Sequence, residues 1–260
     1  MKTLLAALLL LAGCAGIADA GALVDVQIID RSTGQTLETW RHQGRLYIAG
    51  APGNRYAVSL RNKAGGRVLT VVSVDGVNAV TGETAATSQS GYVLAPGQAA
   101  DIAGWRKSMD EVAAFYFTSV ADSYAGRTDR PQNVGVIGVA VFREAEPPRP
   151  LLLPAPGTAR DKAASAESAA DNLTRGEARS APAAAAAPPA ESRLGTGHGE
   201  RLAARTEYTD FRRLGDQPSE IITIHYDSRA NLIARGIIPG APAYGRPNPF
   251  PGGFVADPKG

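Results

Sequence analysis

Cysteine and histidine are scarce in this 260-residue chain, and its net charge is small. Its one cysteine, Cys14, excludes an internal disulfide framework. The 27 lysines and arginines are nearly balanced by 25 aspartates and glutamates, which leaves a formal charge of +2. That charge is far from the concentrated positive field that binding many phosphates requires, so nucleic acid is not an expected partner. Glycine (29) and proline (18) are in excess and exclude a long helical bundle.

Hydrophobic residues are plentiful, at 44% of the chain against 20% charged residues. This balance predicts at least one folded domain with a buried core rather than general disorder. The longest apolar run near the N-terminus, residues 4–12, is too short to cross a bilayer as a helix. With one positive charge before it and small residues after it, the run predicts an exported protein with a signal peptide over residues 1–20.

The end of this run resembles the lipobox of bacterial lipoproteins: Leu11-Ala12-Gly13-Cys14 is an aliphatic residue, two small residues and a cysteine. The resemblance implies cleavage before Cys14, acylation of that cysteine, and attachment to a membrane through the lipid. Residue 15 is Ala rather than the Asp of the inner-membrane retention signal, which implies the periplasmic face of the outer membrane. The alternative is cleavage after Ala20, which would release a soluble periplasmic protein.

Residues 22–145 contain short alternating or β-branched segments separated by turn residues, which is typical of strands. The expected strands are residues 24–29, 46–49, 55–61, 68–74, 91–94, 100–105, 112–118 and 134–142. Turn signals recur about every 8 to 12 residues, and no helix-length periodic segment alternates with the strands. These features predict an all-β fold, an antiparallel β-sandwich of the immunoglobulin-like or jelly-roll-like kind.

The rest of the chain falls into three parts by composition. Residues 146–192 are rich in alanine and proline and contain no aromatic residue, which predicts a disordered linker. Residues 193–238 predict a small β/α segment, with a strand at 221–227 and a short helix capped by Ser228. This segment is too small to fold alone, so we expect it to dock on the sandwich, as by adding a strand at an edge. Residues 239–260 predict a Pro/Gly-rich tail.

No motif in the chain predicts a catalytic residue, a metal site or a cofactor. The three histidines are His42, His198 and His225, and no nucleophile elbow or phosphate loop accompanies them. The glycine-rich stretch at 194–200, which contains His198, is interpreted as a flexible turn. The alternative is a ligand-binding or hydrolytic module that uses the region of His198 and His225, with Glu200 and Asp227 as further metal ligands.

The strongest candidate for a binding surface is Trp105-Arg106-Lys107, at the end of an expected strand. Tryptophan and arginine are common at binding hot spots, and an aromatic ring beside two cations suits an anionic surface, a glycan or a partner strand. The competing interpretation places Trp105 in the sandwich core and the two cations at its solvated exit.

Four phrases of the sequence resemble those of uncharacterised exported proteins of Gram-negative bacteria. They are residues 104–108, 133–142, 194–200, and 226–228 followed by 231–232. The resemblance supports a C-terminal segment that belongs with the sandwich, and it carries no known activity. The sequence therefore predicts a non-enzymatic cell-envelope lipoprotein whose β-sandwich has a structural, protein-binding or glycan-binding role.

Overall fold

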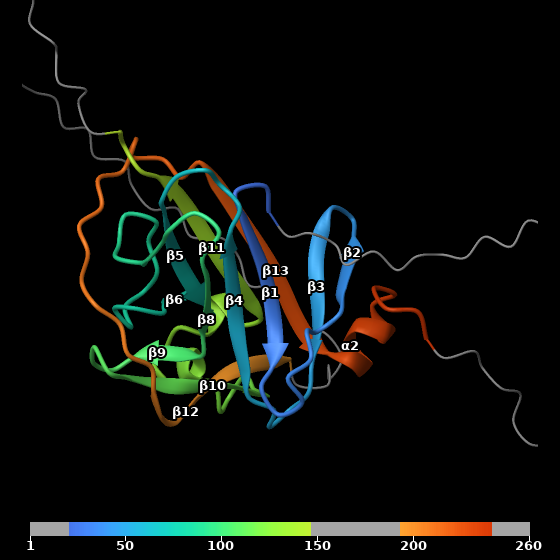
Figure 1. The fold of residues 1–260 in the computed structure, drawn as a ribbon. Coiled ribbons are helices and arrows are strands. Elements are labelled where there is room, and N and C mark those ends of the chain that lie inside the picture. The colour runs from blue at the N-terminus through green and yellow to red at the C-terminus, as the bar shows by residue number, and fades with distance from the viewer. Residues whose placement is uncertain (1–20, 147–192, 241–260) are drawn as a thin grey trace, which may run out of the picture.

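The computed structural model describes residues 21–146 and 193–240. Three β-sheets built largely from antiparallel strands form an all-β, sandwich-like fold, which confirms the expected fold class. The expected signal peptide with Cys14 lies outside the described residues, as do the linker expected at 146–192 apart from Glu146 and the tail expected at 239–260 apart from its first two residues. Figure 1 shows the sheets packed around a shared interior.

The first sheet is antiparallel and has the strand order β1-β4-β8. Its strands are β1 (Val24–Asp30), β4 (Tyr56–Asn62) and β8 (Ala99–Ile102). In β1 every second side chain is buried, as the alternation in the sequence predicts. Val26 pairs with Leu60 and Ile28 pairs with Val58, so these side chains share the face that packs on the core.

The second sheet has the order β2-β3-β13-β11-β5-β6, and β7 also pairs with β5. Its strands are β2 (Thr39–His42), β3 (Arg45–Gly50), β5 (Val68–Val74), β6 (Val77–Asn78), β7 (Tyr92–Leu94), β11 (Val136–Arg143) and β13 (Glu220–Ser228). All pairs are antiparallel except β13 with β3, which is parallel. The nearly continuous β-branched run of β5 is almost entirely buried, as expected for a central strand.

The third sheet lies at one end of the molecule and has the order β12-β10-β9 (Figure 1). Its strands are β9 (Gly104–Arg106), β10 (Glu111–Ser119) and β12 (Leu194–Ala203). The single strand expected at 100–105 is therefore two short strands, β8 and β9, which belong to different sheets. The helices are α1 (Tyr124–Arg127), the 3₁₀ turn η1 (Pro131–Asn133) and α2 (Arg229–Ala234).

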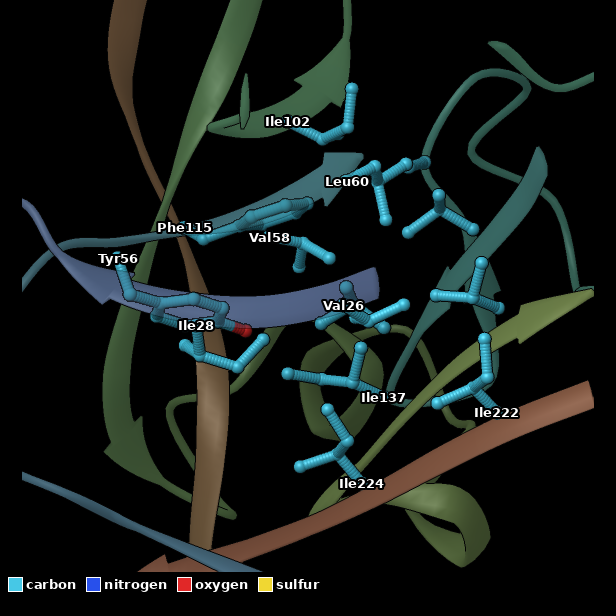
Figure 2. Close-up of a cluster of buried hydrophobic side chains, with 14 of the residues drawn as sticks. Val26, Ile28, Tyr56, Val58, Leu60, Ile102, Phe115, Ile137, Ile222 and Ile224 are labelled. Atoms are coloured by element: carbon cyan, nitrogen blue, oxygen red, sulfur yellow. The ribbon is translucent and has the colours of Figure 1, made fainter. Parts of the chain in front are cut away.

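The main core lies between the first sheet and the second. Figure 2 shows Val26 and Ile28 of β1 pointing towards Ile137 of β11 and Ile224 of β13. These side chains are between 1% and 2% exposed, so the hydrophobic effect acts on nearly their whole surface. The core therefore includes residues from both sides of the 147–192 segment.

The C-terminal segment is built into the sandwich rather than added at its rim. Strand β13 lies between β3 and β11, in the interior of the second sheet, whereas β12 forms an edge of the third sheet. The edge position expected for the C-terminal segment thus applies to β12 but not to β13. Ser228 caps α2, as predicted, by accepting a hydrogen bond from the backbone N–H of Asn231 at 3.2 Å.

Candidate functional site

Three aromatic side chains from different elements meet at the end of the sandwich formed by the third sheet. Trp105 of β9 lies 4.9 Å from Tyr124 of α1, measured between ring centroids, and 6.4 Å from His198 of β12. The ring centroids of Tyr124 and His198 are 5.4 Å apart, with the planes inclined at 34°. We call Trp105, Tyr124 and His198 the ring cluster.

Strand register brings the ring cluster together. His198 is paired with Phe115 across β12 and β10, and Trp105 is paired with Ala113 across β9 and β10. The β10–β12 ladder has a register shift between Ala113 and Phe115, so alternation alone does not place the two rings. The ring contacts of Trp105 with Phe115 and His198 show that they lie on the same side of β10. Trp105 contacts the Phe115 ring edge-on at 4.8 Å, which fixes the indole between the core and His198.

The ring cluster runs from the interior to the surface. Trp105 is 2% exposed, Tyr124 is half-buried and His198 is exposed. The indole Nε1 of Trp105 is buried and has no hydrogen-bond partner among the described residues. A buried donor without a partner costs about 1–3 kcal/mol, and such groups are few in native proteins. The ring cluster is therefore packed tightly at its base and open at its outer end.

Positive charge surrounds the exposed end of the ring cluster. Burial, the nearby Lys107 and then Arg127 and Arg201 all hold the pKa of His198 below its usual value of 6.5, so the imidazole is neutral at pH 7. The guanidinium of Arg130 also lies 5.6 Å from the Tyr124 ring centroid, a cation–π distance. This end of the molecule presents apolar ring faces beside cations.

A similar arrangement around His225 differs in two respects. The His225 ring lies 5.3 Å from Tyr47, with the planes inclined at 30°, and Arg235 lies over the same tyrosine. Tyr47 is buried in a small cluster with Leu232 of α2, so its ring is covered. Arg235 is ion-paired with Asp227 at 3.6 Å. The tyrosine of the His225 pair is covered and Arg235 is neutralised, although the nearby Arg45 also lowers the pKa of His225.

The structure divides the candidate surface Trp105-Arg106-Lys107 among three environments. Trp105 is buried, as the competing core interpretation expects. The half-buried Arg106 donates hydrogen bonds to backbone carbonyls of Ser108, Met109 and Ala204 and stacks on the ring of Tyr92, so it holds loops together. Lys107 alone is exposed and lies near His198. The three residues do not form one open surface.

The interpretation of residues 194–200 as a flexible turn is wrong, because these residues are the first part of strand β12. The glycines there allow close packing rather than flexibility. A Cβ at Gly197 would lie 2.1 Å from Cζ of Tyr116, and one at Gly195 would lie 2.7 Å from Cβ of Ser123. Glycine in a strand marks either a bend or a close approach, and here it marks the approach.

The two histidines of the alternative hypothesis are not brought into one site. His198 packs with Trp105 and Tyr124, whereas His225 packs on Tyr47 of β3. No group of three or more histidine, cysteine, aspartate or glutamate side chains able to hold a metal ion occurs in residues 21–146 and 193–240. The expected further ligands pair with arginines instead, Glu200 with Arg55 at 2.6 Å and Asp227 with Arg235 at 3.6 Å.

A buried polar network that the sequence did not reveal joins the N-terminal and C-terminal parts. Asp75 accepts hydrogen bonds from the hydroxyl of Tyr226 (2.5 Å) and the backbone N–H groups of Thr196 (2.8 Å) and Gly135 (3.0 Å). The Thr196 hydroxyl bonds in turn to Tyr226 and Tyr56. The only signal was Asp75-Gly76, which indicates a turn but not burial.

Burial raises the pKa of Asp75 to about 6, although the hydrogen bonds from Tyr226 and the backbone oppose the rise. The pKa values of Tyr56 and Tyr226 also lie above their usual range because both rings are buried near Asp75. All four side chains of this network are closed off from solvent. We therefore assign it to the joining of β4, β12, β13 and the turn after β5 rather than to chemistry on a ligand.

An open groove of about 830 Å³ is lined by residues outside the ring cluster, among them Gly66, Arg67, Arg143 and Arg212. Arg67 there is ion-paired with Glu144 at 3.3 Å, and neither Asp75 nor Trp105 lines this groove. In the part of the chain that the structure covers, no helix has the length and apolar character needed to cross a membrane.

Comparisons with known proteins add no assignment. A scan against protein-family models, a search of curated proteins and a search of solved structures each found no match to this chain. The candidate site is thus defined by its geometry and charge.

Proposed function

We propose that this protein is a cell-envelope lipoprotein, attached through Cys14 to the outer membrane on its periplasmic side, whose sandwich binds a glycan at the ring cluster. The observation that carries the binding proposal is the stacked set of Trp105, Tyr124 and His198, closed at its base and exposed at its end. The proposed attachment rests on the lipobox-like sequence before Cys14.

The ring cluster suits the binding of a sugar better than it suits catalysis. The C–H face of a pyranose ring packs on an aromatic face, and the polar tips of tyrosine and histidine reach the sugar hydroxyls. A neutral imidazole can donate and accept one hydrogen bond each, as a hydroxyl-rich ligand requires. The ring cluster holds no nucleophile with an oriented base, so binding without catalysis is the function that its groups support.

The binding proposal is tested by retention of the full mature chain, purified in detergent, on two isolated envelope glycans: peptidoglycan sacculi and lipopolysaccharide. Retention on at least one is expected, and His198→Ala should weaken it about tenfold or more. His225→Ala is the matched control, because His225 stacks on a tyrosine at nearly the same distance outside the ring cluster. Failure of the wild type to bind either glycan, or equal loss in both variants, would refute the proposal.

Fluorescence gives a second readout. The chain has two tryptophans, Trp40 and Trp105, so Trp40→Phe leaves the ring-cluster tryptophan as the sole indole. Glycan binding should then change the emission of Trp105 in a saturable way. Attachment is tested separately with Cys14→Ser: loss of membrane partitioning supports lipidation, and normal processing with unchanged partitioning argues against it.

A further inference from the structure

The third sheet turns one face to the core and the other outwards, and Tyr116 of β10 lies on the outer face. Figure 1 shows this sheet at one end of the molecule. Phe115 and Phe117, on either side of Tyr116 in β10, are 0% exposed and belong to the core. Because side chains alternate along a strand, Tyr116 projects from the opposite face, where it is half-buried.

Two glycines of β12 let the ring of Tyr116 lie flat on this outer face. A Cβ at Gly197, the residue paired with Tyr116, would lie 2.1 Å from Cζ, 2.4 Å from Cε1 and 2.5 Å from the hydroxyl oxygen of the tyrosine. These three distances together are met by a point above the ring face, not by a point in the ring plane. A Cβ at Gly199 would lie 3.3 Å from Cδ1 of the same ring. One face of the ring therefore rests on the β12 backbone, a close approach that glycine permits.

The opposite face of the Tyr116 ring holds no other aromatic ring and no cation from the part of the chain that the structure describes. Two other tyrosines that are not buried, Tyr92 and Tyr124, each have an arginine over the ring. Tyr208, between β12 and β13, is 91% exposed, so its ring has no support from a sheet. Tyr116 therefore offers a ring that backbone holds flat on one side and that is open to a ligand on the other.

An ion pair accompanies the Tyr116 ring on the outer face. Arg55, just before β4, forms a β-bridge with Tyr116 on the side of β10 away from β12. Its Nε lies 2.6 Å from Oε1 of Glu200 in β12, so the pair crosses β10, and the two side chains are 51% and 46% exposed. The guanidinium supplies N–H donors, the carboxylate supplies acceptors, and the two charges cancel.

We infer that the outer face of the third sheet is a second sugar-binding surface, on which an uncharged pyranose unit packs its C–H face on Tyr116 and bonds its hydroxyl groups to Arg55 and Glu200. This inference rests on the proposed glycan-binding function and adds a contact that the ring cluster does not contain. The electron-rich face of an aromatic ring suits C–H groups. A sugar hydroxyl both donates and accepts, which matches a guanidinium beside a carboxylate. The paired charges favour an uncharged unit of the glycan, because they leave no net charge for an anion to neutralise.

The test is retention of the full mature chain on peptidoglycan sacculi and on lipopolysaccharide, with variants of Tyr116. Tyr116→Leu keeps an apolar side chain over the glycines but removes the flat ring, and it should weaken binding to at least one glycan about tenfold. Tyr116→Phe keeps the ring and should bind within about threefold of wild type. Tyr208→Ala is the control, because it removes an exposed tyrosine outside the third sheet and should bind as wild type does. Circular dichroism and urea unfolding confirm that each variant is folded.

Two further measurements test the polar part of the surface. Arg55→Ala/Glu200→Ala leaves the net charge unchanged and removes an exposed pair that contributes little to stability, so the variant should fold and bind more weakly. The ratio of wild-type to Tyr116→Leu binding should be the same at 50 mM and 500 mM salt, because ions screen exposed net charge. Wild-type binding by the double variant would overturn the role of the ion pair, and a ratio that vanishes at high salt would overturn the uncharged sugar unit.

The outcomes separate this inference from the proposed function. If Tyr116→Leu binds both glycans as wild type does, or if Tyr116→Phe loses as much as Tyr116→Leu, the second surface is wrong, and loss in His198→Ala still supports the ring cluster. If Tyr116→Leu weakens binding and His198→Ala does not, the second surface stands and the ring cluster is not the site. A wild-type protein that binds neither glycan would refute both.

Discussion

Asp75 makes the stability of this protein depend on pH in a direction opposite to that of most carboxylates. Its pKa is about 6 in the folded protein against 3.8 in the unfolded chain, because the carboxylate is buried. The folded state therefore binds the proton more tightly than the unfolded state does. The stabilisation is fully present below pH 3.8 and is lost as the pH rises through 6.

The shift of 2.2 pH units, 6 minus 3.8, corresponds to at most about 3 kcal/mol of unfolding free energy. Between pH 7.5 and pH 5.0, the linkage relation gives a gain of about 1.4 kcal/mol from Asp75 alone. Two other groups act in the opposite direction over this range: the pKa values of His198 and His225 are lowered by burial and by nearby cations. Their contribution falls as the pH drops through 6.5.

The assay is urea unfolding of wild type and Asp75→Asn at pH 5.0, 6.0, 6.75 and 7.5. Asparagine is isosteric and tolerates the positive φ of 54° at this position. It places an amide N–H against the backbone N–H of Thr196, which lowers stability by an amount independent of pH. Both histidines are common to the two proteins, so the difference in unfolding free energy between them isolates Asp75.

We expect that difference to grow by about 1.4 kcal/mol from pH 7.5 to pH 5.0. Tyr226→Phe gives a second check, because the Tyr226 hydroxyl donates the hydrogen bond that lowers the Asp75 pKa most. Its removal should shift the transition in stability to higher pH. A difference between wild type and Asp75→Asn that is constant over the whole range would refute the raised pKa.

Three further predictions concern packing. Trp105→Ala should lower the unfolding free energy by about 3–5 kcal/mol, because the side chain is buried. Trp105→Phe should lower it much less, because phenylalanine keeps a ring and removes the unpaired N–H. Equal losses of the two variants in urea unfolding would contradict this. Gly104→Ala should prevent folding at 37 °C, since its Cβ would lie 2.0 Å from the carbonyl oxygen of Ala113, while Gly65→Ala, in open space, should be tolerated. A fragment of residues 21–146 should show no cooperative unfolding transition, because it lacks the interior strand β13; a sharp transition would mean that the N-terminal part folds alone.

Local sequence patterns predicted most strands of the first two sheets. In β1 and β4, alternating apolar residues identify both the strand and its buried face, and the β-branched run of β5 identifies a central strand. These signals are local, because the side chains of a strand alternate with a period of two whichever strands it pairs with. The same holds for the cap of α2, where one serine satisfies a backbone N–H three residues on.

The site depends on pairings that a local pattern does not contain. By composition, the glycines of β12 are typical of a turn. Only the pairing of β12 with β10 shows that they lie in a strand, and the side chains packed against them show why glycine is needed there. His198 meets Trp105 because β12 and β9 both pair with β10, across more than 90 residues of sequence. The buried Asp75 accepts hydrogen bonds from backbone groups of Gly135, just before β11, and of Thr196 in β12, both far from it in the sequence.

The sequence by itself therefore determined the all-β class, the place of most strands and the division of the chain by composition, since each rests on the properties of neighbouring residues. The tertiary structure alone decided which strands are neighbours, that β13 is interior, and which rings and cations share a surface. Register and packing are properties of residue pairs far apart in the chain, and many pairings are compatible with the same alternation until the whole core is closed.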